Sequence, residues 1–364
     1  MKKKFGFGCM RLPMNGDNVD SEQFKKMVDL FIKEGFNYFD TAHVYISGQS
    51  ETEIKKCLTD CYPRDQYILT DKLSGSCFKK ESDIVPFFEK QLALTGVEYF
   101  DYYLMHALNT ENYAKFESCN AFEIAKELKR TGKIKHIGMS FHDTAPVLDK
   151  ILSEHPEIEI VQIQFNYTDY EDPAIQSRTV YEVCEKHKKQ VIVMEPCKGG
   201  SLINLPKLAQ DVFDEDGGSY ASYAIRFAAS FPAVVMVLSG MSTIGQVEEN
   251  LGFMKHFKPI NEKEKIAIDK VQKILMNQNL IKCTDCRYCV EGCPQNIFIP
   301  ALFACYNKKK QFENWNSDLY YNNTTGKGLG KASDCIQCGK CEAICPQHLP
   351  IIELLTDVAK TFEK

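Results

Sequence analysis

The 364-residue sequence has no run of about 20 apolar residues, the length that a membrane-spanning helix requires. Residues 2–4 are lysines, but Gly6, Gly8 and Arg11 follow where an export signal would have its apolar core. No strong excess of one charge is present either, because the net charge is −5. We therefore expect no membrane span, no export signal and no nucleic-acid partner.

A disulfide framework is not indicated, although the chain has 16 cysteines. Disulfide scaffolds are typical of short secreted chains, and this chain is long. Half of the cysteines are scattered, and the other half form two tight groups near the C-terminus. This distribution predicts a reducing, cytoplasmic location and one dedicated metal-binding region.

The first predicted strand–helix junction lacks a glycine-rich phosphate loop, which disfavours an open doubly wound sheet. From residue 5 to about 255, short β-rich runs alternate with segments of helical periodicity. Alternating strands and helices predict a parallel sheet, and eight repeats in this length favour a closed (β/α)8 TIM barrel. The predicted strands are residues 5–9, 36–41, 67–72, 99–106, 134–140, 158–165, 190–195 and 234–239.

The segments between the strands predict helices, among them residues 21–34, 83–94 and 121–130. In the first of these, Ser21 is the candidate N-cap and Gly35 follows the last turn. Residues 261–276 predict one more helix, with Asn261 and Glu264 as its capping box. We place the domain boundary after this helix, with the barrel at 1–276 and a smaller, α-rich C-terminal domain at 277–364.

Three predicted strands end in the polar residues Asp40, Lys72 and His106, and Tyr45 lies in the loop after Asp40. In a barrel the C-terminal ends of the strands meet at one face, where catalytic residues lie. Each of the four residues alone fits an ordinary structural role, such as a cap or a packed histidine. Their combination on neighbouring strand–helix units predicts a catalytic group.

These residue types suit proton delivery to a carbonyl during hydride transfer. Tyrosine has an ordinary pKa of about 10, too high for efficient acid–base chemistry at neutral pH. We expect the Lys72 ammonium to stabilise the phenolate of Tyr45 and to lower the pKa of that phenol. Asp40 would pair with Lys72, and His106 would donate a hydrogen bond to the substrate oxygen.

From residue 5 to about 255 the chain resembles the aldo-keto reductases. The resemblance rests on residues 6–12, 40–42 with Tyr45, 50–51, Lys72, 104–106, 132–140, Gln162, Pro196 with Gly200, 239–242 and 249–250. It implies a catalytic tetrad of Asp40, Tyr45, Lys72 and His106 on a (β/α)8 barrel. It also implies interconversion of an aldehyde or ketone and an alcohol.

The resemblance further implies a nicotinamide cofactor bound across the barrel mouth. Ser140 and Gln162 would contact its carboxamide, and residues 240–250 would hold the adenosine phosphate end at a helix N-terminus. The residues assigned to the cofactor in this way are Gly8, Met10, Arg11, Asp40, Ser140, Gln162, Met194, Pro196, Gly240, Ser242, Gln246, Glu249 and Asn250.

Two positions depart from the family pattern. Met194 and Glu195 stand where many members stack a tyrosine on the nicotinamide. Gly240 and Gln246 stand where many clamp the 2′-phosphate with a lysine and an arginine. Because some relatives bind NADP with Ser and Gln in this segment, NADP(H) is the preferred cofactor and NAD(H) is the alternative.

The two cysteine groups repeat the spacing C-x2-C-x2-C-x3-C-P. This spacing is typical of bacterial ferredoxins with 4Fe–4S clusters, and a zinc site seldom uses four cysteines in so short a run. In two-cluster ferredoxins the fourth cysteine of each group binds the other cluster. The predicted sets are therefore Cys283, Cys286, Cys289 and Cys345, and Cys335, Cys338, Cys341 and Cys293.

Cys305 fits neither group and is interpreted as a packed thiol. The long interval between Cys293 and Cys335 predicts an inserted helix or a docking surface. The whole chain therefore resembles an aldo-keto reductase with a C-terminal ferredoxin-type domain that holds two 4Fe–4S clusters.

The main hypothesis is an NAD(P)H-dependent oxidoreductase acting on a small carbonyl or alcohol. Hydride transfer needs no iron, so the clusters would either exchange electrons or stabilise the fold. One alternative is an electron-transfer protein that links the nicotinamide to a ferredoxin-like partner, although no flavin motif is present to split the electron pair. Another is a nucleotide-binding redox sensor, which the intact tetrad disfavours. The sequence does not name the substrate.

Overall fold

The computed structural model describes residues 3–110, 112–172, 175–215, 217–276, 280–281, 283, 287–312, 316–326, 328–345 and 349–363. The chain divides into two compact units, which we describe separately. The barrel unit comprises Met1–Gly199 and Gly218–Glu262, and the C-terminal unit comprises Gly200–Gly217 and Lys263–Lys364. This division falls between Glu262 and Lys263, whereas the sequence places a domain boundary after residue 276.

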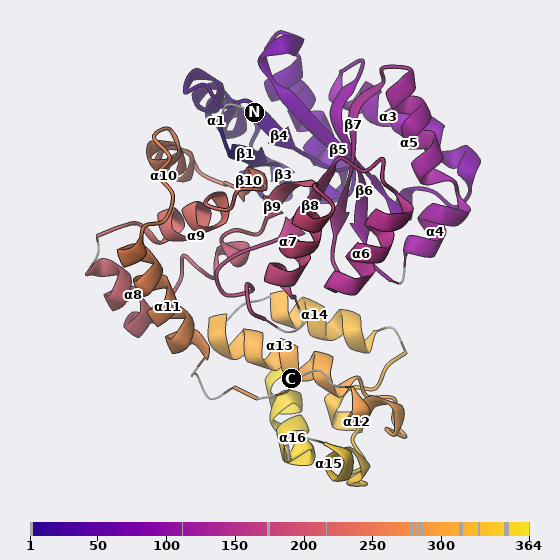
Figure 1. Ribbon diagram of the computed structural model, residues 1–364, viewed down its shortest axis with the longest axis vertical. Helices are drawn as coiled ribbons and strands as arrows, with labels where there is room; N and C mark the ends of the chain where they lie inside the picture. Colours follow the sequence, from indigo (N-terminus) through magenta and orange to yellow (C-terminus); the bar gives the residue numbers. More distant parts are fainter. Residues whose placement is uncertain are drawn as a thin grey trace. The chain divides into compact units, whose positions relative to one another are not determined.

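Eight parallel strands close the barrel in the order β1-β10-β9-β8-β7-β6-β5-β4 (Figure 1). The (β/α)8 fold predicted from the sequence is therefore confirmed. The strands are β1 (Phe5–Gly8), β4 (Tyr38–Asp40), β5 (Ile68–Ser74), β6 (Phe100–Leu108), β7 (Ile134–Phe141), β8 (Ile160–Gln164), β9 (Gln190–Met194) and β10 (Val234–Gly240).

Two differences from the predicted strands matter for the site. Strands β5 and β6 each continue two residues beyond the predicted ends, to Ser74 and Leu108. The sequence also gave no sign of the short antiparallel hairpin formed by β2 (Met14–Asn15) and β3 (Asn18–Val19). Its strands are only two residues long, too short to produce a recognisable alternation.

The barrel interior changes from apolar to polar along the strands. An apolar cluster fills the interior, made of Tyr38, Tyr102, Leu104, Ile160, Ile192, Met236 and Leu238. Side chains alternate between the two faces of a strand, so the residue two positions further along also points inward. Those next residues are polar on three strands, namely Asp40, His106 and Gln162. The predicted catalytic face is therefore the C-terminal end of the barrel.

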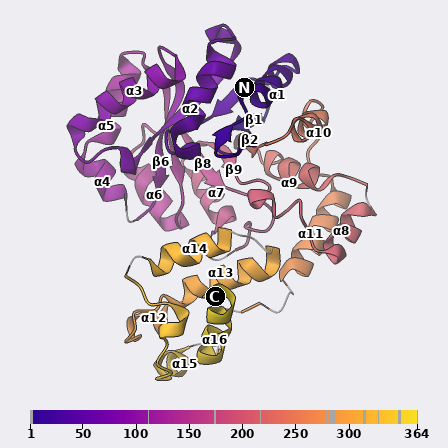
Figure 2. The same cartoon turned by 180° about the vertical axis from the view of Figure 1, so that it is seen from behind.

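Helices lie around the strands in both ribbon views (Figures 1 and 2). They are α1 (Ser21–Lys33), α2 (Gln49–Ile54), α3 (Ile84–Thr95), α4 (Tyr113–Ser118), α5 (Ala121–Arg130), α6 (Ala145–Glu154), α7 (Ser177–Lys186), α9 (Tyr220–Ala229) and α10 (Ile244–Met254). The predicted N-cap of α1 was wrong. Asp20 caps the helix by accepting a 2.9 Å hydrogen bond from the Gln23 backbone N–H, while the Ser21 hydroxyl bonds to Glu53.

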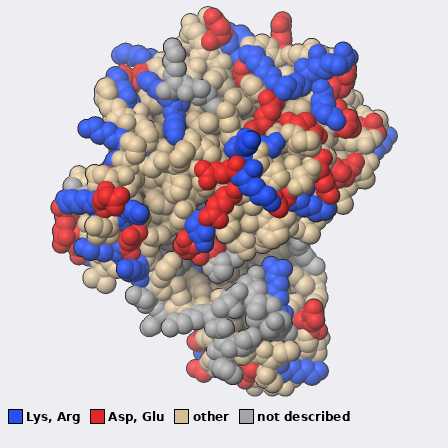
Figure 3. Space-filling model, in the orientation of Figure 1, with Lys and Arg blue, Asp and Glu red and all other residues tan. Residues whose placement is uncertain are grey.

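Charged side chains of both signs are interspersed over the barrel unit on the face drawn in Figure 3. Such mixing matches the small net charge of the chain. In the described part of the chain, no helix is both long and apolar enough to cross a membrane.

The C-terminal unit is helical. Its helices are α8 (Lys207–Asp214), α11 (Glu262–Met276), α12 (Tyr288–Glu291), α13 (Ile299–Phe312), α14 (Asn316–Thr325), α15 (Lys340–Ile344) and α16 (Ile351–Phe362). Helices α13 and α14 pack together and occupy the long interval between the two cysteine groups. Cys305, on α13, lies in an apolar cluster with Leu302 and Phe303, and burial raises the pKa of its thiol to about 11. This environment fits the packed thiol expected from the sequence.

Close packing at the barrel centre makes Gly138 a test of the fold. A Cβ atom there would lie 2.4 Å from Leu104 Cδ2 and 2.9 Å from the Ile160 backbone oxygen, so the strands would have to shift. We expect Gly138→Ala to lower the free energy of unfolding by about 1–3 kcal/mol. Denaturant unfolding of the full chain measures this change.

Gly252 on α10 provides the matched control, because a Cβ there meets nothing within 4 Å. Gly252→Ala should raise stability by about 0.5–1 kcal/mol, since alanine favours the helix. Equal stabilities for the two alanine variants would contradict the packing that we describe for the barrel interior.

Candidate active site and cysteine pocket

A buried ion pair lies at the C-terminal end of the barrel. The Lys72 ammonium on β5 donates to Asp40 Oδ1 on β4 at 2.5 Å and to the Thr41 backbone oxygen at 2.8 Å. Gln162 on β8 donates to the other Asp40 oxygen at 3.1 Å. Lys72 is completely buried and Asp40 is 3% exposed. The structure thus brings the predicted pair together and holds it with partners from three strands.

The loop after β4 carries Tyr45 to this pair. The Lys72 nitrogen lies 4.8 Å from the centre of the Tyr45 ring, within reach of a cation–π interaction. Ile46 and Ser47 follow with left-handed φ values of 50° and 53°. Such angles are unfavourable for a β-branched residue such as Ile46, so packing must hold the turn that places Tyr45.

The pKa of Tyr45 differs from the sequence-based expectation. Burial raises the pKa of the phenol, and Lys72 lowers it, as predicted, but Asp40 acts against the lysine. The net pKa lies above the ordinary value of 10. The expectation was wrong because it included the neighbouring ammonium and omitted the loss of hydration. Tyr45 therefore remains protonated at neutral pH.

The ion pair keeps Lys72 charged. Burial alone lowers the pKa of the ammonium, but Asp40 and Tyr45 together raise it above its ordinary value. Burial also raises the pKa of Asp40, opposed by Lys72 and by the hydrogen bond from Gln162. A short, well-bonded pair of this kind can compensate for part of the desolvation that burial imposes on both charges.

His106 stands at a β-bulge in β6. The pairing with β7 shifts register between Met105 and Leu108, and Ala107 has a left-handed φ of 56°. Bulges often re-aim a side chain next to an active site. The His106 ring lies edge-on to the Tyr45 ring, with centroids 5.8 Å apart. Burial and the nearby Lys72 hold the pKa of His106 well below 6.5, so the imidazole is neutral.

Ser74 is a site residue that sequence reasoning missed. Its hydroxyl lies 2.6 Å from His106 Nδ1, which leaves Nε2 as the ring nitrogen that can meet a ligand. The sequence did contain a pattern that could have identified Ser74, because Thr70, Lys72 and Ser74 are polar residues at alternate positions of one strand. The predicted strand ended at Lys72, so this alternation was not followed to its third member.

Gln91 and Glu51 were also not assigned a role from the sequence. The Gln91 amide donates to Glu51 Oε1 and to the Lys72 backbone oxygen, both at 3.1 Å, and its oxygen accepts from the Tyr103 hydroxyl at 2.6 Å. Glu51 lies in the first turn of α2, the helix that follows the Tyr45 loop. Gln91, on α3, therefore connects the tyrosine-bearing segment to the lysine-bearing strand. No local pattern marks such a long-range connection.

Several residues assigned to the cofactor lie at the same end of the barrel. Gly8 pairs with both Asp40 and Gly240, and Ser140 pairs with Gln162. The Ser140 hydroxyl accepts from the Ala107 backbone N–H at 2.7 Å, which leaves its own proton available to a ligand.

A second group of assigned residues surrounds the start of α10. The Ser242 hydroxyl donates to the Arg11 backbone oxygen at 2.8 Å, and Gln246 accepts from the Ser242 N–H at 2.7 Å. The Arg11 side chain lies beside Gly240, where an added Cβ would be 3.2 Å away. Thr243 caps the helix.

The remaining assigned residues differ in exposure. Asn250 is buried and donates to Ser239, whereas Met10 is 59% exposed and Glu249 is also exposed. Met194 ends β9 and is partly exposed, and Pro196 is buried after it.

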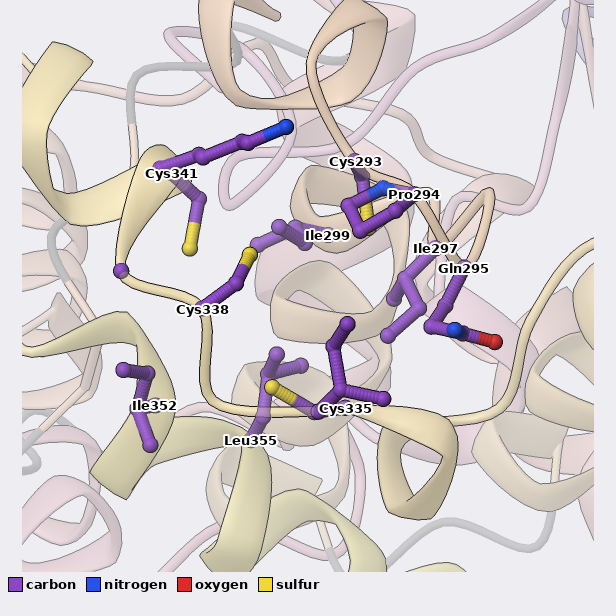
Figure 4. A pocket seen from close by; sticks show the side chains of 13 residues that line it. Cys293, Pro294, Gln295, Ile297, Ile299, Cys335, Cys338, Cys341, Ile352 and Leu355 are labelled. Carbon is purple, nitrogen blue, oxygen red and sulfur yellow. The ribbon is translucent and has the colours of Figure 1, made fainter.

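Four cysteines line one pocket of the C-terminal unit. Cys293, Cys335, Cys338 and Cys341 share its wall with apolar side chains that include Ile297, Ile299 and Leu355. Figure 4 shows their sulfur atoms around this hollow. Three of the cysteines come from the second group and one from the first, which is the crossed set predicted from the spacing. Four soft sulfur donors in an apolar setting fit an iron–sulfur cluster.

The other predicted set is only partly described. Cys283 and Cys345 pack against the apolar cluster that contains Cys289, and α12, which carries Cys289, packs on α15. Cys286 lies outside the described residues. Among the residues that are described, no group of three or more His, Cys, Asp or Glu side chains is arranged to hold a metal ion.

Comparisons with known proteins agree with both parts of the chain. Residues 4–273 match the model of the aldo/keto reductase family, and residues 282–349 match that of a 4Fe-4S dicluster domain. A relative from Melia azedarach, 7-acetyl-epi-neemfruitin B aldo-keto reductase, is 26% identical over 268 residues, which cover 68% of this chain and 78% of the relative.

Solved structures show the same fold. An aldo-keto reductase from Bacillus halodurans in its holo form superposes with a TM-score of 0.61 at 22% identity, covering 74% of this chain and 91% of that one. A second, from Klebsiella pneumoniae in complex with NADPH, has a TM-score of 0.60 at 18% identity, with coverages of 75% and 96%. The family match spans most of the chain, so the protein belongs to the aldo/keto reductase family of oxidoreductases and carries a C-terminal 4Fe–4S dicluster domain.

Proposed function

We propose that the protein is an NAD(P)H-dependent reductase that interconverts an aldehyde or ketone and the corresponding alcohol. The observation that carries this proposal is the buried Asp40–Lys72 pair directly beside Tyr45. Burying a charged lysine costs free energy, which its close partners offset only in part. The charge becomes useful when negative charge develops on the tyrosine oxygen.

In this proposal Tyr45 is the general acid. Its raised pKa keeps the phenol protonated, so the proton is present when a carbonyl oxygen arrives. As the proton leaves, the Lys72 ammonium stabilises the phenolate that forms, a stabilisation absent from the ground state. Asp40 and the Thr41 carbonyl hold the ammonium in place, so no reorganisation is needed at that moment.

His106 orients the carbonyl. When the Ser74 hydroxyl donates to Nδ1, the single proton of the neutral imidazole stands on Nε2. That N–H can then donate to the same substrate oxygen that Tyr45 protonates. The lowered pKa of His106 makes it a neutral donor, so it does not compete with Lys72 as a second positive charge.

The barrel mouth would hold the nicotinamide cofactor, which supplies the hydride when bound. The Gln162 amide donates to Asp40, and Ser140 pairs with Gln162 on the neighbouring strand. These two side chains would contact the nicotinamide carboxamide. Arg11 and the N-terminus of α10 supply positive charge for the phosphate end. We favour NADP(H), in line with the Klebsiella pneumoniae structure in complex with NADPH, and keep NAD(H) as the alternative.

For the clusters we propose the crossed ligand sets. Cys293, Cys335, Cys338 and Cys341 would hold one 4Fe–4S cluster in the pocket of Figure 4. Cys283, Cys286, Cys289 and Cys345 would hold the other. The match to the aldo/keto reductase model ends at residue 273, and the match to the dicluster model begins at residue 282. This gap supports a domain boundary after residue 276.

The exposed position of the cysteine pocket favours electron exchange as the role of the clusters. Cys338 is exposed, and the neighbouring Ile336 is 58% exposed. A cluster at this position would be near enough to the surface for a ferredoxin-like carrier to approach.

The first test of this function is Tyr45→Phe. Without the phenolic proton, kcat for NADPH-dependent reduction of an aldehyde panel should fall about 100-fold or more. Tyr67→Phe is the matched control, because Tyr67 is a buried tyrosine outside the site, and it should keep wild-type kcat. Full activity in Tyr45→Phe would show that the tetrad assignment is wrong.

The iron content of anaerobically purified protein tests the clusters. The wild type should contain about eight irons per chain, and Cys335→Ser/Cys338→Ser about four. Adding Cys293→Ser to this variant should remove no more iron, because all three residues belong to one set. Cys305→Ala, which changes the packed thiol, should keep about eight. Zinc with negligible iron would refute the clusters, and further iron loss with Cys293→Ser would refute the crossed pairing.

A further inference from the structure

A short 3-10 turn, Ala332–Asp334, leads directly into Cys335. Helical turns of this type are brief and poorly bonded, so partners outside the turn determine how firmly it is held. Cys335 is one of the four cysteines that line the pocket, and in Figure 4 it lies below the hollow, with Cys293 above it. The turn therefore determines where the Cys335 sulfur stands.

Tyr321 on α14 holds the first residue of this turn. Its hydroxyl accepts a 2.9 Å hydrogen bond from the Ala332 backbone N–H. Tyr321 and Ala332 are each 2% exposed, so water is largely kept from this bond. Without the hydroxyl, a buried N–H group would lose its partner, which is rare in native structures. The Tyr321 ring also stacks on Phe362 of α16, with ring centroids 4.5 Å apart and planes 3° from parallel.

Glu363, directly after α16, holds the second residue of the turn. Its Oε1 accepts from the Ser333 backbone N–H at 3.1 Å, and its Oε2 accepts from the Ser333 hydroxyl. Oε1 also accepts from the Tyr321 hydroxyl. Hydrogen bonds to an ionised carboxylate are roughly twice as strong as those between neutral groups. Glu363 thus connects the Tyr321 side chain and the turn to the end of α16.

These contacts give the long interval between the two cysteine groups a structural role. Tyr321 lies in that interval, on α14, and Glu363 follows it by 42 residues. A third contact is local, because Asp334 accepts from the Lys331 N–H at 2.7 Å. Three successive backbone N–H groups, those of residues 331–333, therefore each have a side-chain acceptor. Groups that bond to a ligand-bearing segment, rather than to the metal itself, commonly decide how tightly a metal is held.

We propose that Tyr321 and Glu363 are positioning residues that hold the Cys335 turn (residues 331–335) for the 4Fe–4S cluster of the cysteine pocket. Neither of them is among the residues that line the pocket, so they would act through the turn. The inference rests on the ligand set proposed above, in which Cys335 binds this cluster. It predicts a selective effect, because the other proposed set has no member in the turn.

Tyr321→Phe tests the hydroxyl, because phenylalanine keeps the stacked ring and removes only the bonds to Ala332 and Glu363. In anaerobically purified full-length protein, iron release to a ferrous chelator should become about tenfold faster for about four of the roughly eight irons. The other irons should keep the wild-type rate. Tyr320→Phe is the matched control, since it removes a hydroxyl from the adjacent, 51% exposed residue of α14, and it should release iron as the wild type does.

Substitutions of Glu363 separate its hydrogen bonds from its charge. Glutamine keeps a carbonyl oxygen for the Ser333 N–H and the Tyr321 hydroxyl, so Glu363→Gln should keep most of the wild-type rate. Glu363→Ala removes these bonds and should release iron at least as fast as Tyr321→Phe. A redox titration followed by EPR supplies a second readout. In Tyr321→Phe the midpoint potential of one cluster should shift, while that of the other stays at its wild-type value.

Two outcomes overturn the proposal. One is an equal rate of iron release in Tyr321→Phe, Tyr320→Phe and the wild type. The other is faster loss of iron from both clusters together with a lower denaturation midpoint, which indicates a general role in folding. Cys335→Ser/Cys338→Ser is measured in parallel. If that variant keeps about eight irons, the proposed ligand set fails, whereas about four irons there with wild-type release in Tyr321→Phe refutes only the roles of Tyr321 and Glu363.

Discussion

The buried contact between the Lys72 ammonium and the Asp40 carboxylate is the interaction on which the site depends. Removing two charges from water costs several kcal/mol per ion, and only close, well-bonded geometry compensates for it. The structure meets this requirement with a 2.5 Å ion pair, a bond to the Thr41 carbonyl and the Gln162 amide on the second carboxylate oxygen. Because these partners come from β4, β5 and β8, the pair also fixes those strand ends relative to one another.

The side chains of Tyr45 and His106, to which we assign catalytic roles, are placed by irregular backbone around this pair. Tyr45 precedes two left-handed residues, and His106 precedes a bulge at Ala107. On a regular strand only every second side chain points inward, at a fixed spacing. The Gln91 bridge then connects the tyrosine segment to the lysine strand. The barrel provides the rigid base, and the irregular segments bring Tyr45 beside the ammonium and His106 beside Tyr45.

The chain carries two kinds of redox chemistry in separate units. The chemistry proposed for the barrel, hydride transfer from a nicotinamide, is a two-electron step that needs no iron. The cysteine pocket is built differently, from soft sulfur donors in an apolar wall that includes Ile297 and Leu355. Each unit has its own apolar core, so each site is supported locally. This separation explains why the sequence signals of the two sites could be recognised independently.

The sequence by itself indicated the eight strands, the proposed tetrad and the two cysteine groups, because short-range patterns carry them: period-2 runs, polar strand ends and fixed cysteine spacing. It could not supply the net pKa of Tyr45 or the bond from Ser74 to His106. Only the tertiary structure decided these features. These features depend on burial, strand register and a bulge, which arise from residues far apart in the chain. No local sequence pattern encodes the combined effect of such distant residues.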